Sequence, residues 1–415
     1  MRALAALASA LLTAAAARPA VAQAPTLTPP VTAPGIGVMP RPGSTLVALT
    51  LVIPAGSADD PDTIPGSARL LGEAVAHAAR GRLDPSSARL DVRVERGWTA
   101  YMLLTAPDLW VHSWGVLEDA VFRGSLADTA IEAARAALIE GFAFDAGAPV
   151  REFQRELYYV LGGAMDPWSR DPRGTRAALR KAEPAALKEF RERHYNLAQA
   201  TAAVVGPVTE QEVHEALAPV GAGPLARPAS AGPVWKRGDR LPLERDVTNA
   251  WIGAAFPAHG DLPRTQLEFV AHQLQESLSP ALPDPGVFSV FVHIEDTPTG
   301  PVVVVEVAVM PEVSKTWEKR ILAAVDGLKD ETEEPFFRWQ RRRFQSAALL
   351  REGQPKEAAL RVALDLSRDG RVRSLLEEVE AIGPRDLAAA TAGLEAPRVL
   401  VMGPGLGAGS TDSGR

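Results

Sequence analysis

The chain has 415 residues and a mass of 44.1 kDa, which fits two or three domains better than one. Hydrophobic residues make up 46% and charged residues 23%, the balance of a globular protein rather than a disordered one. The 44 Lys and Arg against 51 Asp and Glu leave a net charge of −7, which argues against general nucleic-acid binding. The absence of cysteine excludes disulfides, thiolate zinc sites and cysteine nucleophiles.

The first residues have the layout of a secretory signal peptide. A positive start at Arg2 precedes an uncharged apolar run over residues 3–17. Small residues then offer a cleavage site after Ala22, with Ala24 as a second option. The apolar run is too short for a membrane anchor, and no later run reaches the length of a membrane span. We therefore expect residues 1–22 to be removed and the protein to be exported, to the periplasm or outside the cell.

Residues 23–43 are rich in Pro, Thr and Gly, which predicts an extended leader with ordered structure from about Ser44. Residues 45–53 have the composition of a strand, which Pro54 ends. A helix is predicted from about Gly66 to Arg80, because its apolar residues recur at helical spacing.

The second half of the chain repeats the layout of the first. Residues 249–256 predict a strand that again ends at a Pro-Ala pair and is followed by a helix. Both halves also contain a helix that opens with Pro and leads into a strand ending in Gly-Pro. Three landmarks recur 203, 200 and 197 residues apart: Pro54 and Pro257, Pro184 and Pro384, and Gly206 and Gly403. This spacing indicates an internal duplication.

The predicted organisation is two homologous α+β domains over residues 44–220 and 239–404. Residues 221–238 are rich in Gly and Pro and predict a linker, and residues 405–415 predict a flexible tail. Strands and helices alternate without a regular βαβ rhythm. We therefore expect mostly antiparallel sheets with helices packed on one face.

Five segments of the chain form a recognisable pattern: Ile53-Pro54-Ala55-Gly56-Ser57 and residues 66–73, 166–175, 189–196 and 202–208. In this order they resemble the M16 metallopeptidase family, in its short two-domain form. The resemblance covers essentially Ser44 to Pro404 and implies two LuxS/MPP-like domains.

Active members of that family carry His-x-x-Glu-His on the first long helix, where two histidines bind Zn²⁺ and the glutamate activates water. The resemblance places Arg69 and Glu73 at the two histidine positions and Gly72 at the position of the general base. Glu140 is the match for the third ligand. Arg69 has no free lone pair for a cation and Gly72 has no side chain, so we expect an ion pair here and no catalysis.

The second half also departs from the family pattern. Some M16 pairs use an Arg and a Tyr of the C-terminal domain to hold the substrate backbone. In this chain Phe288 lies near the expected Tyr, and no Arg occurs between Arg264 and Arg320. No substrate-binding residue is therefore assigned.

Three other patterns are weaker. His214-Glu215 is half of a zinc motif that lacks its second histidine, and Glu73 with His77 offers only two ligands, so both predict ordinary helix surface. Arg338 and residues 341–343 alternate with aromatic residues. We interpret this basic stretch as pairing with the acidic run at residues 331–334, or as facing a protein partner.

The leading functional hypothesis is a non-catalytic M16-type subunit. It would hold no cofactor and would complete a peptide-degrading clamshell with a zinc-bearing M16 peptidase, forming a heterodimer that encloses an unfolded peptide. One alternative is a stand-alone or homodimeric peptide-binding or structural protein without a protease partner. The other is a zinc metallopeptidase with a relocated metal site.

Overall fold

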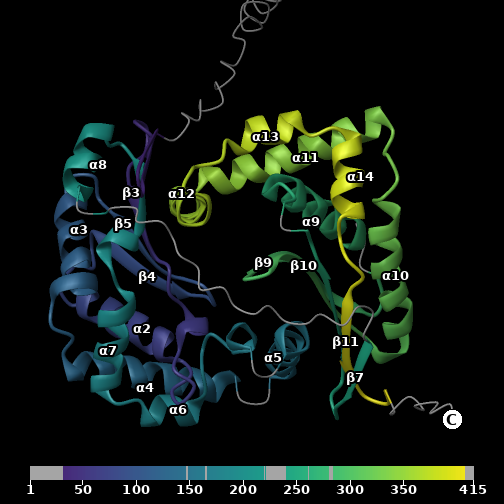
Figure 1. The fold of residues 1–415 in the computed structure, drawn as a ribbon, viewed down its shortest axis with the longest axis horizontal. Helices are drawn as coiled ribbons and strands as arrows, with labels where there is room; N and C mark the ends of the chain where they lie inside the picture. Colours follow the sequence, from purple (N-terminus) through teal and green to yellow (C-terminus); the bar gives the residue numbers. More distant parts are fainter. Residues whose placement is uncertain are drawn as a thin grey trace, which may run out of the picture.

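The computed structural model describes residues 31–145, 148–163, 166–218, 220, 240–259, 261–279 and 284–406. In these residues the chain forms two α+β halves, each built on one mostly antiparallel sheet (Figure 1). The predicted fold class is therefore confirmed. The expected signal peptide (1–22) and linker (221–238) lie outside the described residues, as does most of the expected tail (405–415).

The first sheet has six strands in the order β1-β2-β6-β3-β5-β4. Only β2 and β6 run parallel, and all other neighbours are antiparallel. The strands are β1 Val31–Ala33, β2 Ile36–Pro40, β3 Val47–Ile53, β4 Ala88–Val94, β5 Thr99–Thr105 and β6 Thr201–Gly206.

The expectation that ordered structure begins near Ser44 was wrong. Strand β2 lies inside the expected leader and pairs with β6, from Ile36 opposite Ala202 to Pro40 opposite Gly206. Val38 is fully buried there. The apolar residues 36–39 supply the strand, and the surrounding Pro and Gly residues conceal it in the composition.

The second sheet has five strands in the order β7-β11-β8-β10-β9, which is the order of β2-β6-β3-β5-β4 in the first. Here β7 and β11 are the parallel pair. The internal duplication therefore extends to strand order and direction. The strands are β7 Arg240–Glu244, β8 Ala250–Pro257, β9 Val287–Thr297, β10 Gly300–Val309 and β11 Arg398–Gly403.

The helices follow the same duplication. Those of the first half are α2 Ser67–Arg80, α3 Trp110–Glu118, α4 Asp128–Asp145, α5 Pro149–Gly162, α6 Arg176–Lys181, α7 Pro184–His194 and α8 Glu210–Leu217. Those of the second half are α9 Arg264–Leu278, α10 Ser314–Gly327, α11 Glu334–Gly353, α12 Pro355–Asp369, α13 Leu375–Ala381 and α14 Pro384–Ala392. Single turns lie at η2 Ser57–Asp59, η3 Asp119–Arg123, η4 Pro167–Ser169, η5 Leu197–Gln199 and η6 Pro311–Val313. The helix predicted from about Gly66 to Arg80 is confirmed as α2.

Each sheet packs one face against helices of its own half. In the first half, Leu49 and Leu51 of β3 share a core with Leu71 of α2. In the second half, Ile252 of β8 shares a core with Phe269 of α9. These contacts bury the apolar stripe of each long helix, which is the main source of helix stability in water.

The other face of each sheet is covered by a helix from the opposite half (Figure 1). Helix α12 of the second half packs Val362 and Leu366 against the first sheet, and Thr201 of β6 donates a hydrogen bond of 2.9 Å to the carbonyl of Ala363. Helix α5 of the first half packs Phe153 and Leu157 against the second sheet. Strands β3, β6 and β8 are therefore buried along their whole length, which explains why they are apolar on both faces.

Two glycines let these exchanged helices approach the sheets closely. A Cβ at Gly37 of β2 would lie 2.3 Å from a methyl group of Val362. A Cβ at Gly253 of β8 would lie 2.7 Å from a methyl group of Leu157. Any larger residue at either position would push the helix away from the sheet.

In the described part of the chain, no helix is long and apolar enough to cross a membrane.

The exchanged helices α5 and α12, each of which covers the sheet of the opposite half, lead to two matched predictions about stability. Leu157 of α5 and Leu366 of α12 are both buried against the sheet of the opposite half. We expect Leu157→Ala and Leu366→Ala each to lower the free energy of unfolding by about 3 kcal/mol, because each leaves a cavity between the halves.

Urea unfolding followed by circular dichroism measures the effect. Leu350→Ala is the control, because Leu350 of α11 is 75% exposed and its truncation should change stability by less than about 0.5 kcal/mol. Since each helix ties one half to the other, both variants should still unfold in one transition. Separate transitions for the two halves would contradict this view of the fold.

Candidate functional site

The N-terminus of α2, the helix that contains Arg69, Gly72 and Glu73, is held by a buried carboxylate. Asp60 accepts hydrogen bonds from the amides of Gly66 at 2.6 Å and Ala68 at 2.7 Å. Gly66 has φ = 100°, a conformation that glycine adopts at little cost, and this turn directs the chain into the helix. Burial raises the pKa of Asp60 to about 7, against the opposing effect of the two amides and of Arg170.

Arg69 and Glu73 form the ion pair that the sequence predicts. They lie one turn apart on α2, with Nη2 of Arg69 2.7 Å from Oε1 of Glu73. Arg80 approaches the other oxygen of Glu73 at 3.6 Å. Both carboxylate oxygens of Glu73 therefore face guanidinium groups, which leaves it poorly suited to bind a cation. The side chains are only partly buried, so the pairs contribute little to stability.

Gly72 faces the sheet. A Cβ built there would lie 3.1 Å from a methyl group of Val94 and 3.3 Å from one of Val92, both on β4. The methyl group of Thr99 on β5 would be 3.6 Å away. The packing of α2 on the sheet thus leaves little room for any side chain at this position.

Glu140 is exposed on α4, which packs beside α2. No ion pair or hydrogen bond joins its side chain to Arg69 or Glu73. Among the described residues, no three His, Asp or Glu side chains are grouped so that they could hold a metal ion. The structure therefore does not bring the four motif-related positions together as a ligand set.

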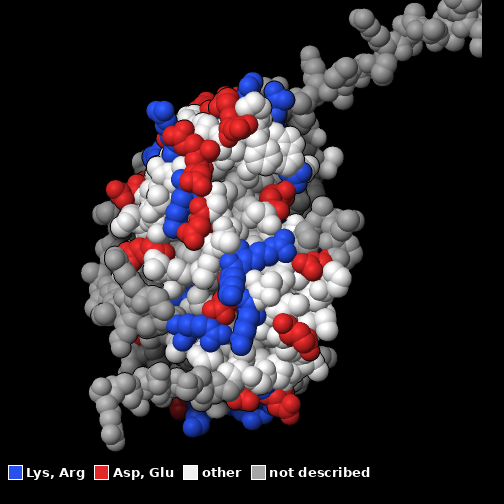
Figure 2. All heavy atoms as spheres, turned by 90° about the vertical axis from the view of Figure 1, so that its right-hand side faces the viewer, with Lys and Arg blue, Asp and Glu red and all other residues white. Residues whose placement is uncertain are grey.

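The other sequence candidates lie apart from this site. His77 is exposed on α2, and His214 on α8 lies 3.8 Å from Glu210, one turn earlier. In the basic stretch of α11, Arg338 lies 3.4 Å from Glu334, as predicted. Arg341 instead donates hydrogen bonds to the carbonyls of Glu380 and Ile382 at the end of α13. Figure 2 shows a face on which one group of Lys and Arg is surrounded by scattered acidic residues.

Phe288 is 58% exposed at the start of β9, together with Phe291 at 57%. A bulge at this end of β9 places Val287 rather than Phe288 against the core of the second half. Residues 280–283, which precede Phe288 in the stretch compared with the family, lie outside the described residues. Both aromatic side chains are therefore open to solvent on β9.

A buried polar cluster joins the two halves, and sequence analysis missed it. Arg96 follows β4 in the first half and is 5% exposed. Its Nε donates to the carbonyl of Trp168 at 2.7 Å, its Nη1 lies 3.2 Å from Glu295 of β9, and it covers the ring of Tyr158 at 3.4 Å. Arg96 and Glu295 are 199 residues apart, so no local pattern could have revealed the pair.

His293 lies beside this cluster on β9. Its Nε2 is 4.0 Å from Glu306 of β10, which also accepts a hydrogen bond of 3.2 Å from Gln154 of α5. Burial, reinforced by the charge of Arg96, lowers the pKa of His293 to about 4. Burial raises the pKa of both Glu295 and Glu306. Glu306 therefore offers His293 little negative charge at acid pH.

The outer edge of each sheet is partly blocked by a side chain from the equivalent helix. Arg80 of α2 donates from Nε to the carbonyl of Leu90 on edge strand β4 at 2.8 Å. Gln275 of α9 donates to the carbonyl of Val290 on edge strand β9 at 3.1 Å and accepts from the amide of Val292 at 2.8 Å. The amide of Gln275 thus makes the bonds that an added peptide strand would make.

Comparison with solved structures identifies this architecture. A protease from Helicobacter pylori superposes with a TM-score of 0.74 at 14% identity, covering 91% of this chain and 100% of that one. The inactive domain of an M16 peptidase from Pseudomonas fluorescens gives a TM-score of 0.72 at 13% identity, covering 89% and 95%. An M16-like peptidase from Alicyclobacillus acidocaldarius gives 0.69 at 14%, covering 92% and 100%.

The chain has the M16 peptidase fold. The resemblance drawn from the sequence is therefore confirmed at the level of the fold, including its similarity to an inactive M16 domain. No protein-family model matches the sequence, and comparison with curated proteins finds no match. At such low identity the likeness establishes architecture only, and function has to be argued from the residues.

Within the M16 fold, the packing of Gly72 makes a direct prediction. We expect Gly72→Glu to lower the free energy of unfolding by about 3 kcal/mol, because the side chain would be forced against Val92 and Val94 and its carboxylate buried. Thermal unfolding measures the change. Gly115→Glu on α3 is the matched control, since Gly115 is exposed and a Cβ there meets no atom within 4 Å. Equal effects of the two substitutions would show that Gly72 is not tightly packed.

The low pKa of His293 predicts how the stability of the protein depends on pH. Unfolded His293 takes up a proton as the pH falls below about 6.5, whereas folded His293 does so only near pH 4. Acidification through this range therefore favours the unfolded state, and stability from this group is fully present above pH 6.5. Between pH 7 and pH 4, we expect the free energy of unfolding of His293→Gln to fall by about 3 kcal/mol less than that of the wild type.

Urea unfolding across this pH range measures the difference between the two proteins. His77→Gln is the control, because His77 is exposed, and it should keep the wild-type pH profile. Parallel stability curves for His293→Gln and the wild type would contradict the assignment.

Proposed function

We propose that this chain is a non-catalytic M16-type subunit that pairs with a zinc-bearing M16 peptidase and completes a chamber enclosing an unfolded peptide. The proposal rests on the side chains that α2 carries at three positions. At the positions that the family resemblance assigns to the zinc ligands, Arg69 and Glu73 form an ion pair. At the position of the general base, Gly72 packs against the sheet. In this proposal the chain binds no zinc and its partner supplies the metal.

The preserved fold supports a role for the chain in such an assembly. The superpositions cover about nine-tenths of the chain, and one of the similar structures is an inactive M16 domain. A chain that kept the whole fold without the catalytic residues can still form part of a chamber wall and contact a peptide. We further propose, from the signal-like N-terminus, that the complex forms in the periplasm or outside the cell.

Helix α11 offers a surface for the partner. Phe336, Trp339 and Leu350 are 53%, 50% and 75% exposed, and their spacing places them on one face of the helix. The rings of Phe336 and Trp339 stack at 5.4 Å, and Arg343 lies over Trp339 at 4.9 Å. Aromatic residues and arginine are enriched at protein interfaces, so this stripe supports pairing.

The exposed aromatic pair on β9 favours a second candidate, a peptide-binding protein that works alone or as a homodimer. Phe288 and Phe291 could contact an apolar peptide without help from another chain. This candidate requires no protease partner, and the same experiment separates the two.

The test mixes the purified mature protein with a zinc-containing M16 relative from the same host. Light scattering after gel filtration and cleavage of a fluorogenic peptide are measured for each protein alone and for the mixture. We expect a one-to-one complex, cleavage in the mixture well above that of either protein alone, and loss of cleavage on adding a chelator. An obligate interface of this kind should bury roughly 2,000 Å² or more.

A double variant, Trp339→Ala with Leu350→Ser, tests the surface. It should weaken the complex at least tenfold, because hot-spot aromatic residues contribute about 2 kcal/mol or more. Arg69→Gln is the matched control, which should leave complex formation unchanged. A mixture that forms no complex and gains no activity would overturn pairing and leave the stand-alone candidate. Stoichiometric zinc in the purified chain would instead support a relocated metal site.

A further inference from the structure

A cavity of about 630 Å³ lies in the second half and has no role in the site described above. Its walls come from three segments that are distant in sequence. They are the first turn of α9, the turn between β9 and β10, and the end of α12 with the chain that follows it into α13. Four arginines line it: Arg264, Arg368, Arg371 and Arg373.

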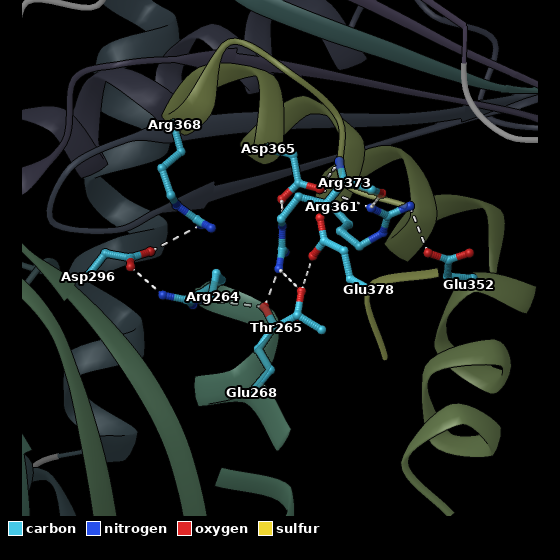
Figure 3. Close-up of polar contacts among 10 residues, drawn as sticks. All are labelled: Arg264, Thr265, Glu268, Asp296, Glu352, Arg361, Asp365, Arg368, Arg373 and Glu378. Carbon is cyan, nitrogen blue, oxygen red and sulfur yellow. Dashed lines mark hydrogen bonds and ion pairs between the residues drawn. The ribbon is translucent and has the colours of Figure 1, made fainter. Parts of the chain in front are cut away.

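A network of buried ion pairs holds in place the chain after α12, which carries Arg371 and Arg373 (Figure 3). Asp365 of α12 is 1% exposed and accepts from Arg373 at 3.0 Å and from Arg361 at 2.9 Å. Arg373 also reaches Glu268 of α9 at 3.2 Å. Arg373 is therefore paired with two carboxylates, and these ion pairs hold the loop after α12 against α9. Arg373 has a structural role and is not available to a ligand.

Of the remaining arginines, Arg264 also pairs with two carboxylates, those of Glu268 at 3.3 Å and of Asp296. Arg264 and Arg368 point at the same carboxylate, that of Asp296, from opposite sides (Figure 3). Arg368 is 19% exposed in its side chain and makes one ion pair of 3.1 Å, which uses few of its five N–H donors. Burial lowers its pKa, and the nearby Arg264 and Arg373 act in the same direction. Arg371 is exposed and has no ion pair among the described residues.

The charges of the cavity wall select one class of ligand. Arg264 and Arg373 are each paired with two carboxylates, so Arg368 and Arg371 are the lining arginines that keep donors for a ligand. Asp296, Asp369 and Glu378 also line the cavity, and they would repel a phosphate dianion more strongly than a monoanion. Guanidinium groups also bind carboxylates with two parallel hydrogen bonds.

The size and composition of the cavity indicate that the anion belongs to a larger molecule. A volume of about 630 Å³ is far more than a single carboxylate fills. Apolar side chains occupy the wall beside the arginines, among them Leu262, Pro298 and Ile382. Such a wall matches a carboxylate that is attached to an apolar side chain, as in the last residue of a peptide.

We propose that this cavity binds the terminal carboxylate of a peptide through Arg368 and Arg371, with the apolar C-terminal side chain against the surrounding wall. The choice of a peptide as the carrier rests on the proposed function, whereas the choice of a carboxylate rests on the cavity alone. The cavity would thus give the protein a preference for free peptide ends.

Binding is measured by fluorescence anisotropy on the mature chain alone, with a labelled peptide that ends in leucine as a free acid or as its amide. We expect the acid to bind at least tenfold more tightly, because one charge-assisted contact is worth about 1.4 kcal/mol or more. Arg371→Gln should weaken the acid about fivefold or more and leave the amide unchanged. Arg368→Gln with Arg371→Gln should abolish the preference for the acid.

Arg342→Gln on α11 is the matched control, because it removes the same charge from an exposed arginine that does not line the cavity. It should leave binding unchanged. Equal affinity for acid and amide, or an equal effect of Arg342→Gln and Arg371→Gln, would overturn the proposal. Stronger competition by inorganic phosphate than by N-acetyl-leucine would overturn the carboxylate assignment, and N-acetyl-leucine binding as tightly as the peptide would overturn the peptide as carrier.

This experiment needs no partner subunit, so its result is independent of pairing. Loss of acid preference with an intact complex would remove only the cavity proposal. Acid preference without complex formation would keep the cavity and overturn the pairing.

Discussion

The exchange of α5 and α12 between the two halves is the constraint on which the rest of the structure depends. Each sheet has two apolar faces, and the helices of its own half cover only one of them. The second face is buried because a helix of the other half lies across it. Burying strands on both faces stabilises them through the hydrophobic effect, and it also makes each half incomplete without the other. Gly37 and Gly253 give the two helices the space this arrangement requires.

Helix α2 packs on the first sheet through residues other than Arg69 and Glu73. The packing of α2 on the first sheet depends on its apolar face, together with the small residue at Gly72. Arg69 and Glu73 are partly buried, and their ion pair is of the kind that neighbouring turns of a helix form. The fold therefore does not need the residues that an active enzyme needs. The chain accordingly has the M16 peptidase fold with an arginine–glutamate ion pair on this helix.

Charged residues that are buried in this protein lie where segments from different parts of the chain meet. Arg96 joins the first half to Glu295 of the second, and Arg373 joins the end of α12 to α9. A buried charge is costly unless a partner and hydrogen bonds compensate for it, so these contacts favour one arrangement of the segments over others. The cavity beside Arg368 lies among segments that these contacts hold together, because Arg373 ties the chain after α12 to α9 and Arg368 pairs with Asp296 at the end of β9.

The sequence alone determined the duplication, the bounds of α2 and the Arg69–Glu73 pair, because each depends on residues within one repeat or one helical turn. It also indicated the fold, through short patterns in a fixed order. Only the tertiary structure decided that residues 36–40 form a strand, since parallel pairing with β6 and burial under α12 make it one. The exchanged helices, the Arg96–Glu295 contact and the arginine-lined cavity also needed the tertiary structure. Each joins residues dozens to more than 300 positions apart, such as Gly37 and Val362, and local periodicity carries no signal across such distances.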